Sequence, residues 1–130
     1  MQQHANGELI LIVEDNEKNM KLARDILEFH GFATVEATTG EQGVALARER
    51  RPALILMDIQ LPGIDGVAAF ERIRRDESTA RIPVVAMTAS VMKEDRERFD
   101  KAGFDGFITK PIDVRAFPGQ VRDAIAKARA

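Results

Sequence analysis

Short apolar segments of the chain alternate with longer segments in which apolar residues recur at helical spacing. Near-continuous aliphatic runs of about four to eight residues are typical of strands in a sheet covered on both faces. The predicted strands are Leu9–Val13, Ala33–Ala37, Leu54–Met57, Val84–Met87 and Gly106–Thr109. The predicted helices are Glu17–Phe29, Glu41–Arg50, Val67–Arg75, Lys93–Ala102 and Val114–Ala128.

This alternation predicts βα units, which cross over right-handedly and build a parallel sheet with helices on both faces. The expected fold is therefore an α/β, doubly wound, five-stranded parallel sheet with five helices and the flavodoxin-like strand order 2-1-3-4-5. A chain of 130 residues is long enough for one domain with a sizeable core. We expect that domain over residues 8–130, after a polar, disordered tail over residues 1–7.

Charge and composition exclude several classes of protein. The formal net charge of -2 removes the electrostatic reason to expect nucleic-acid binding. With no cysteine, the chain has neither a disulfide framework nor thiolate metal sites. No apolar run approaches the roughly 20 residues that span a bilayer, and the N-terminus lacks the features of a signal peptide. The expected location is the cytoplasm, with no membrane or nucleic-acid partner.

Charged side chains stand directly after three of the predicted strands. Glu14 and Asp15 follow the first strand, Asp58 the third and Lys110 the fifth. In doubly wound sheets, ligands bind outside the carboxyl ends of the strands at the switch point, which for this strand order lies between the first and third strands. The sequence therefore predicts one acidic pocket at that edge of the sheet.

Carboxylates gathered in one pocket repel each other unless a cation is present. Oxygen ligands without His or Cys indicate magnesium, or manganese in its place, over zinc. Because magnesium in proteins typically combines one or two carboxylates with a phosphate, the pocket is predicted to receive a phosphoryl group.

Asp58 is the predicted nucleophile, since a carboxylate can attack phosphorus to form an acyl phosphate. It ends the central strand and precedes a loop, residues 59–63, that can turn a backbone carbonyl toward the ion. The Lys110 ammonium and the Thr88 hydroxyl would neutralise charge on the phosphoryl oxygens.

Four segments together carry a resemblance to a known family. They are Leu11–Asn16 (LIVEDN), Leu56–Gly66 (LMDIQLPGIDG), Pro83–Ala89 (PVVAMTA) and Ile108–Pro111 (ITKP). In this order and at these spacings they resemble the signature blocks of response-regulator receiver domains, over about residues 8 to 128. The chain looks most similar to single-domain regulators of the DivK cell-cycle type.

The resemblance implies a role for each matching residue. Asp58 matches the phosphoacceptor, Asp15 the direct metal ligand and Glu14 an acid that acts through metal-bound water. Gln60 matches the position whose backbone carbonyl completes the metal shell. Thr88 matches the switch hydroxyl.

At the end of the fifth strand, Lys110 matches the family's lysine, and the Lys110–Pro111 bond resembles a family cis peptide. Phe107 matches the aromatic ring that changes rotamer on activation, although an apolar ring on a strand is as often simply core. The implied partners are a histidine kinase or a histidine phosphotransfer protein, and a downstream protein bound by the fourth helix, fifth strand and fifth helix. Such a chain is a signalling domain and not a turnover enzyme.

Two other functions remain open at this point. A phosphatase of the haloacid-dehalogenase type also uses an Asp nucleophile, magnesium, Thr and Lys, but it needs a second Asp two residues later, where this chain has Gln60. The other is a receiver-like module that binds partners without phosphorylation.

Three further residues receive an interpretation of their own. His4 lies in the polar tail and His30 beside a helix-ending glycine, so neither is the expected phosphodonor. Pro118 departs from the family pattern, because proline is unfavourable inside a helix. The last helix therefore either starts late, near Pro118, or is kinked.

Overall fold

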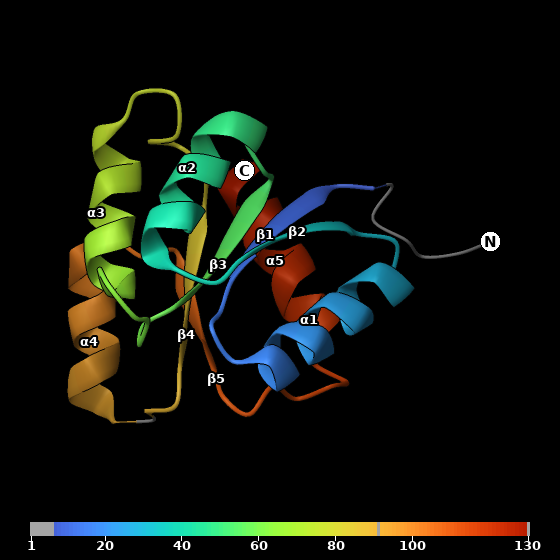
Figure 1. Ribbon diagram of the computed structural model, residues 1–130. Coiled ribbons are helices and arrows are strands. Elements are labelled where there is room, and N and C mark those ends of the chain that lie inside the picture. Colours follow the sequence, from blue (N-terminus) through green and yellow to red (C-terminus); the bar gives the residue numbers. More distant parts are fainter. Residues whose placement is uncertain (1–6, 91, 130) are drawn as a thin grey trace.

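One parallel sheet of five strands, in the order β2-β1-β3-β4-β5, forms the centre of the protein, and a helix follows each strand (Figure 1). The computed structural model describes residues 7–90 and 92–129. The elements are β1 (Leu9–Val13), α1 (Glu17–Phe29), β2 (Ala33–Ala37), α2 (Gly40–Arg50), β3 (Leu54–Asp58), α3 (Gly66–Arg75), β4 (Val84–Thr88), α4 (Lys93–Ala102), β5 (Gly106–Thr109) and α5 (Phe117–Arg129). The predicted fold class, strand order and number of elements are confirmed.

Alternate residues of the central strands enter two separate cores. Ile10 and Ile12 of β1 pack with buried residues of α1 and α5. Leu11 and Val13 pack instead with residues of α2, α3 and α4. In Figure 1, α1 and α5 accordingly cover one face of the sheet, and α2, α3 and α4 cover the other. This two-sided burial explains why β1, β3 and β4 are almost continuously apolar.

Two strands extend one residue beyond their predicted ends. Asp58 is the last residue of β3 and pairs in register with Met87 of β4. Thr88 is the last residue of β4 and pairs with Thr109 of β5. Both polar side chains are therefore anchored by sheet backbone rather than by loop, which fixes their positions at the carboxyl edge.

Helix α1 follows its prediction closely. Its buried residues are the four predicted ones, Met20, Ala23, Ile26 and Leu27. Asn16 caps the helix, since its side chain accepts a hydrogen bond from the Asn19 backbone N–H at 3.0 Å. Among the described residues of the expected tail, Gly7 donates its backbone N–H to the Gly31 carbonyl at 2.9 Å. The rest of that tail, with His4, lies outside the described residues.

Helix α5 starts at Phe117, so the predicted start at Val114 is wrong and the alternative of a late start near Pro118 is confirmed. The Asp113 side chain accepts hydrogen bonds from the backbone N–H groups of Arg115 and Ala116, which closes a turn before the helix. Pro118 is buried in the first helical turn, where a missing N–H costs little because that donor has no partner within the helix.

Helix α4 is more exposed than predicted on its inner side. Phe99 is its only buried residue, and Ala102, expected to face inward, is exposed. The helix ends at Gly103, which adopts a left-handed conformation with φ of 104°. Across residues 7–90 and 92–129, no helix is both long and apolar enough to cross a membrane.

Candidate metal centre at the carboxyl edge of the sheet

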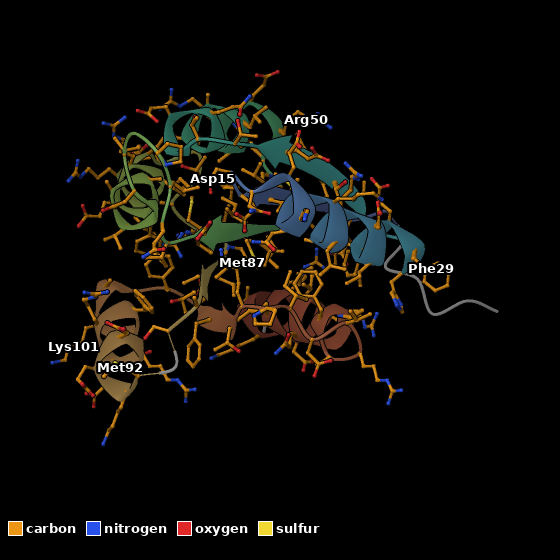
Figure 2. The ribbon with its side chains drawn as sticks, turned by 60° about the horizontal axis from the view of Figure 1, so that its bottom comes forward. Asp15, Phe29, Arg50, Met87, Met92 and Lys101 are labelled. Carbon is orange, nitrogen blue, oxygen red and sulfur yellow. The ribbon has the colours of Figure 1, made fainter. Side chains whose placement is uncertain are left out.

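The acidic residues predicted to share a pocket do lie together. Glu14, Asp15 and Asp58 each offer a carboxylate oxygen, and these atoms lie within 4.8 Å of one another. Glu14 and Asp58 are buried, whereas Asp15 is exposed. Figure 2 turns the bottom of Figure 1 forward and labels Asp15 at this edge, next to the start of α1.

Lys110 reaches these carboxylates from β5. Its Nζ lies 3.1 Å from Asp58 Oδ2 and 3.2 Å from Glu14 Oε1. Its backbone N–H donates to the Thr88 carbonyl at 2.8 Å, which holds the base of the side chain against the end of β4. The peptide bond that follows, Lys110–Pro111, is cis, as the family resemblance implied.

Short loops with specific hydrogen bonds place the acids. Glu14 Oε2 accepts the Asn16 backbone N–H at 3.1 Å, so the residue that caps α1 also orients Glu14. Asp58 Oδ1 accepts the Gln60 backbone N–H at 3.1 Å. Gln60 lines the same pocket of about 700 Å³ as the three acids and Lys110. The expected metal-site residues are therefore all present at one place.

The loop after β3 is closed by a tight approach at Gly66. The Gly66 N–H donates to the Ile59 carbonyl at 3.0 Å. A Cβ atom at position 66 would lie 2.2 Å from the Asp58 carbonyl oxygen and 2.8 Å from Ile59 Cα. Glycine is thus required here, because the backbone that carries Asp58 occupies the space of any side chain.

The pocket contains more negative than positive charge. Burial, together with the hydrogen bond and the negative charge of Asp58, raises the pKa of Glu14 above its ordinary value. Burial acts to lower the pKa of Lys110, but its hydrogen bond to Asp58 and the charges of both carboxylates outweigh burial and raise it. One ammonium therefore does not relieve the repulsion between the acids. This oxygen-only donor set fits a hard divalent cation such as magnesium.

Thr88 and Phe107 occupy different surroundings. Thr88 is buried, and its Oγ1 accepts the Ser90 backbone N–H at 3.0 Å. Phe107 is 37% exposed, and the guanidinium carbon of Arg96 lies 4.9 Å from its ring centroid. The alternative that Phe107 is simply a core residue is wrong.

Residues that the sequence analysis did not single out complete the α4 side of the site. Ser90, Asp95 and Arg98 line a cavity of about 150 Å³ together with Asp58, Thr88 and Lys110. The available sequence signal is a serine three residues before the predicted helix start at Lys93, followed by an acid in the first helical turn. The predicted solvated face of α4 is otherwise confirmed, because most of the charged residues there are exposed.

Comparisons with known proteins agree with this arrangement. Residues 10–122 match the family model of the response regulator receiver domain. The polar-differentiation response regulator DivK of Brucella anthropi is 44% identical over 119 residues, which cover 92% of this chain and 97% of the relative.

Solved structures agree as well. The receiver domain of the sensor histidine kinase PA1611 from Pseudomonas aeruginosa, with a magnesium ion coordinated in its active site cleft, is 33% identical with a TM-score of 0.85, over 92% of this chain and 98% of that one. A putative response regulator from Chloroflexus aurantiacus, 24% identical, shares the fold with a TM-score of 0.87 over 92% and 98%.

The haloacid-dehalogenase alternative finds no support. Asp58 ends the third strand of the chain rather than the first, and Gln60 stands where that class of phosphatase needs an acid. The family match covers most of the chain, from the second residue of β1 through the whole of β5. The chain therefore belongs to the response-regulator receiver family of two-component signalling.

Proposed function

We propose that Asp58 accepts a phosphoryl group from a histidine kinase or a histidine phosphotransfer protein, in a magnesium-dependent reaction in the cytoplasm. The observation that carries this proposal is the pairing of both Asp58 oxygens, Oδ2 with Lys110 Nζ and Oδ1 with the Gln60 N–H, beside Glu14 and Asp15. Uptake of the phosphoryl group then changes the binding of a downstream protein.

The proposed magnesium ligands are Asp15, Asp58 and the backbone carbonyl of Gln60, with Glu14 acting through a metal-bound water. The raised pKa of Glu14 supports a cation at this place, because its causes, burial and a second carboxylate, are offset by positive charge. Manganese, with similar oxygen ligands, would fit the same residues. When bound, the ion neutralises negative charge on the oxygens of the transferring phosphoryl group.

In the proposed transfer, one Asp58 oxygen attacks phosphorus as the bond between phosphorus and the donor imidazole nitrogen breaks, and the electron pair of that bond stays on the nitrogen. The Lys110 ammonium and the Thr88 hydroxyl face the equatorial oxygens of the phosphoryl group. Hydrolysis of the resulting acyl phosphate restores Asp58, so that the protein acts as a resettable signal rather than a turnover catalyst.

Incubation with acetyl phosphate and magnesium, followed by intact-mass measurement, tests this function. The wild-type chain is expected to gain one acid-labile phosphoryl group, and to gain none when magnesium is chelated. Asp58→Asn, which keeps the shape of the side chain, should remain unlabelled. An unchanged wild-type mass would favour the module that binds partners without phosphorylation, and labelling of the variant would place the acceptor elsewhere.

The metal ligands are expected to differ in importance. Asp15→Ala should weaken magnesium binding more than Glu14→Ala, because the first change removes a direct ligand and the second an outer-shell partner, with a loss of roughly 10- to 100-fold for the latter. Titration calorimetry is the suitable measurement, since the chain has no tryptophan to report binding by fluorescence. Equal affinities of the two variants would refute the ranking.

Switching is proposed to run from Thr88 to the surface formed by α4, β5 and α5. The Thr88 hydroxyl would leave the Ser90 N–H and bond a phosphoryl oxygen, which vacates space beside β4. The Phe107 ring, now partly exposed beneath Arg96, could then move inward, since a ring without a hydroxyl loses no polar contact on burial. Phosphorylation in this account shifts a population between two states.

Thr88→Ala tests that coupling. The variant should still accept a phosphoryl group on Asp58, although more slowly, because one donor to its oxygens is lost. Its NMR spectrum with beryllofluoride should lack the chemical-shift changes that the wild type shows over residues 93–102 and 107–117. A wild-type pattern of shifts in the variant would mean that Thr88 does not connect the site with this surface.

A further inference from the structure

The cavity on the α4 side of Asp58 joins the phosphoacceptor to a second cation. Asp58, Thr88 and Lys110 form one part of the lining of this space of about 150 Å³, and Arg98 of α4 lines it from the other side. Among the described residues that line the cavity, Lys110 and Arg98 are the only ones with a positive charge. Arg98 therefore borders the space into which a phosphoryl group on Asp58 would project.

Weak contacts hold the Arg98 side chain in place. Its Nη2 lies 3.3 Å from Asp95 Oδ1, and its guanidinium carbon lies 5.3 Å from the centroid of the Phe99 ring. The side chain is 65% exposed, and an ion pair in such a setting contributes little to stability because solvent screens it. Arg98 can thus leave Asp95 at little cost in free energy.

Asp95 keeps a partner when Arg98 leaves. Its second oxygen, Oδ2, accepts the Ser90 hydroxyl at 2.5 Å, while the Ser90 oxygen accepts the Met92 N–H at 3.2 Å. These bonds anchor the start of α4, whose N-cap residue makes no side-chain hydrogen bond of its own. The position of Asp95 does not depend on the arginine, so an exchange of partners by Arg98 leaves the helix start intact.

After phosphorylation, the charges immediately around Asp58 favour a further cation. A phosphoryl group carries about two negative charges near neutral pH. Together with Glu14 and Asp15, that group outweighs one divalent ion and Lys110 by a single negative charge. A guanidinium supplies this charge, and its planar fork of donors matches two phosphoryl oxygens at once.

We propose that Arg98 exchanges Asp95 for the phosphoryl group of Asp58 and so serves as a second cationic ligand of the aspartyl phosphate. The proposal rests on Asp58 being the phosphoacceptor. Because Arg98 belongs to α4, the exchange also ties this helix directly to the modified side chain, by a route separate from Thr88.

Binding of beryllofluoride in the presence of magnesium, measured by calorimetry, tests the exchange. Arg98→Ala should weaken this binding by roughly 10- to 100-fold, the range expected for loss of a hydrogen bond between charged groups. Arg98→Lys should recover part of the loss, since it restores the charge without the fork. Lys101, labelled in Figure 2, lies in the last turn of α4 and does not line the cavity. Lys101→Ala removes the same charge and should bind beryllofluoride as the wild type does.

Asp95→Asn separates an exchange of partners from a general charge effect. The variant should strengthen beryllofluoride binding, because Arg98 no longer has to leave a carboxylate, and the gain should be larger in the wild-type background than in Arg98→Ala. Each of these variants should still bind magnesium alone, which shows that it is folded.

Three results would contradict the inference or its basis. Binding by Arg98→Ala equal to that by Lys101→Ala would overturn the role of Arg98. A gain from Asp95→Asn that is equal or larger in the Arg98→Ala background would show that Asp95 acts only through its charge. A wild-type chain that neither binds beryllofluoride nor takes a phosphoryl group from acetyl phosphate would instead overturn the proposed function itself.

Discussion

Replacement of Lys110 by alanine is expected to slow phosphorylation of Asp58 by roughly 10²- to 10³-fold, the loss typical for removal of one preorganised donor from a developing negative charge. The Lys110 ammonium lies within 3.2 Å of both Asp58 and Glu14, and among the described residues no second lysine lines the pocket. Without it, two buried carboxylates face each other, and Glu14 loses the positive charge that opposes the rise of its pKa. The initial rate of labelling by acetyl phosphate, followed by intact mass, measures the loss.

Lys21→Ala is the matched control for this change. Lys21 forms an exposed ion pair with Asp25 on α1, away from the pocket, so its removal should leave the labelling rate unchanged. The labelling rate of Lys110→Arg should lie between the rates of the wild type and of Lys110→Ala. The positive charge remains in this variant, but the larger planar guanidinium does not fit the two carboxylate oxygens as well as the ammonium does. A wild-type rate in Lys110→Ala would remove the lysine from the proposed reaction.

Substitution of Gly66 by alanine is expected to lower the free energy of unfolding by about 1 to 3 kcal/mol or more, as overpacked sites do. The new Cβ would stand 2.2 Å from the Asp58 carbonyl oxygen, and its three nearest atoms all belong to the backbone of Asp58 and Ile59, which cannot rotate away as a side chain can. The loop that carries Asp58 must shift, so labelling should slow as well. Urea unfolding monitored by circular dichroism gives the change in stability.

The same substitution at Gly119 is expected to have the opposite effect on the free energy of unfolding. Nothing lies within 4 Å of a Cβ at this position in α5, so alanine should be tolerated and should stabilise the chain by about 0.4 to 1 kcal/mol through its lower entropy when unfolded. If Gly66→Ala were as stable as Gly119→Ala, the close contact of position 66 with the Asp58 and Ile59 backbone would not require glycine there.

The central strands of the sheet were predictable because burial on both faces requires nearly continuous runs of apolar residues. The edge strands β2 and β5 are exceptions, since both are partly exposed. Strand β2 also binds α1 through polar pairs, Thr34 with Glu28 and Glu36 with Arg24. The start of α5 was left open by the sequence, because Pro118 is compatible with a late start or a kink. In the structure the helix starts late, after a turn in which the Asp113 side chain accepts two backbone hydrogen bonds. The pattern of apolar residues does not predict such local hydrogen bonds.

The acids and Lys110 were predictable because parallel strands bring their carboxyl ends to one edge, wherever those ends lie in the sequence. The α4 side of the pocket was not. Asp95 and Arg98 lie in a run of charges typical of a solvated helix face, and only the folded structure shows that they line the same cavity as Asp58. Ala102 illustrates the same limit, since helical spacing places it on the same side of α4 as Phe99 but the structure buries only Phe99.

The raised pKa of Glu14 links folding to the supply of ions. A carboxyl group whose pKa is higher in the folded than in the unfolded chain favours folding at pH values below its unfolded pKa, and this contribution is lost as the pH rises through the folded pKa. At neutral pH the ion-free protein therefore folds against the repulsion in its own pocket. An ion bound only by the folded state adds RT ln(1 + [ion]/Kd) to the free energy of unfolding. With the proposed magnesium ion at this site, the melting temperature of the protein should therefore rise with the concentration of free magnesium.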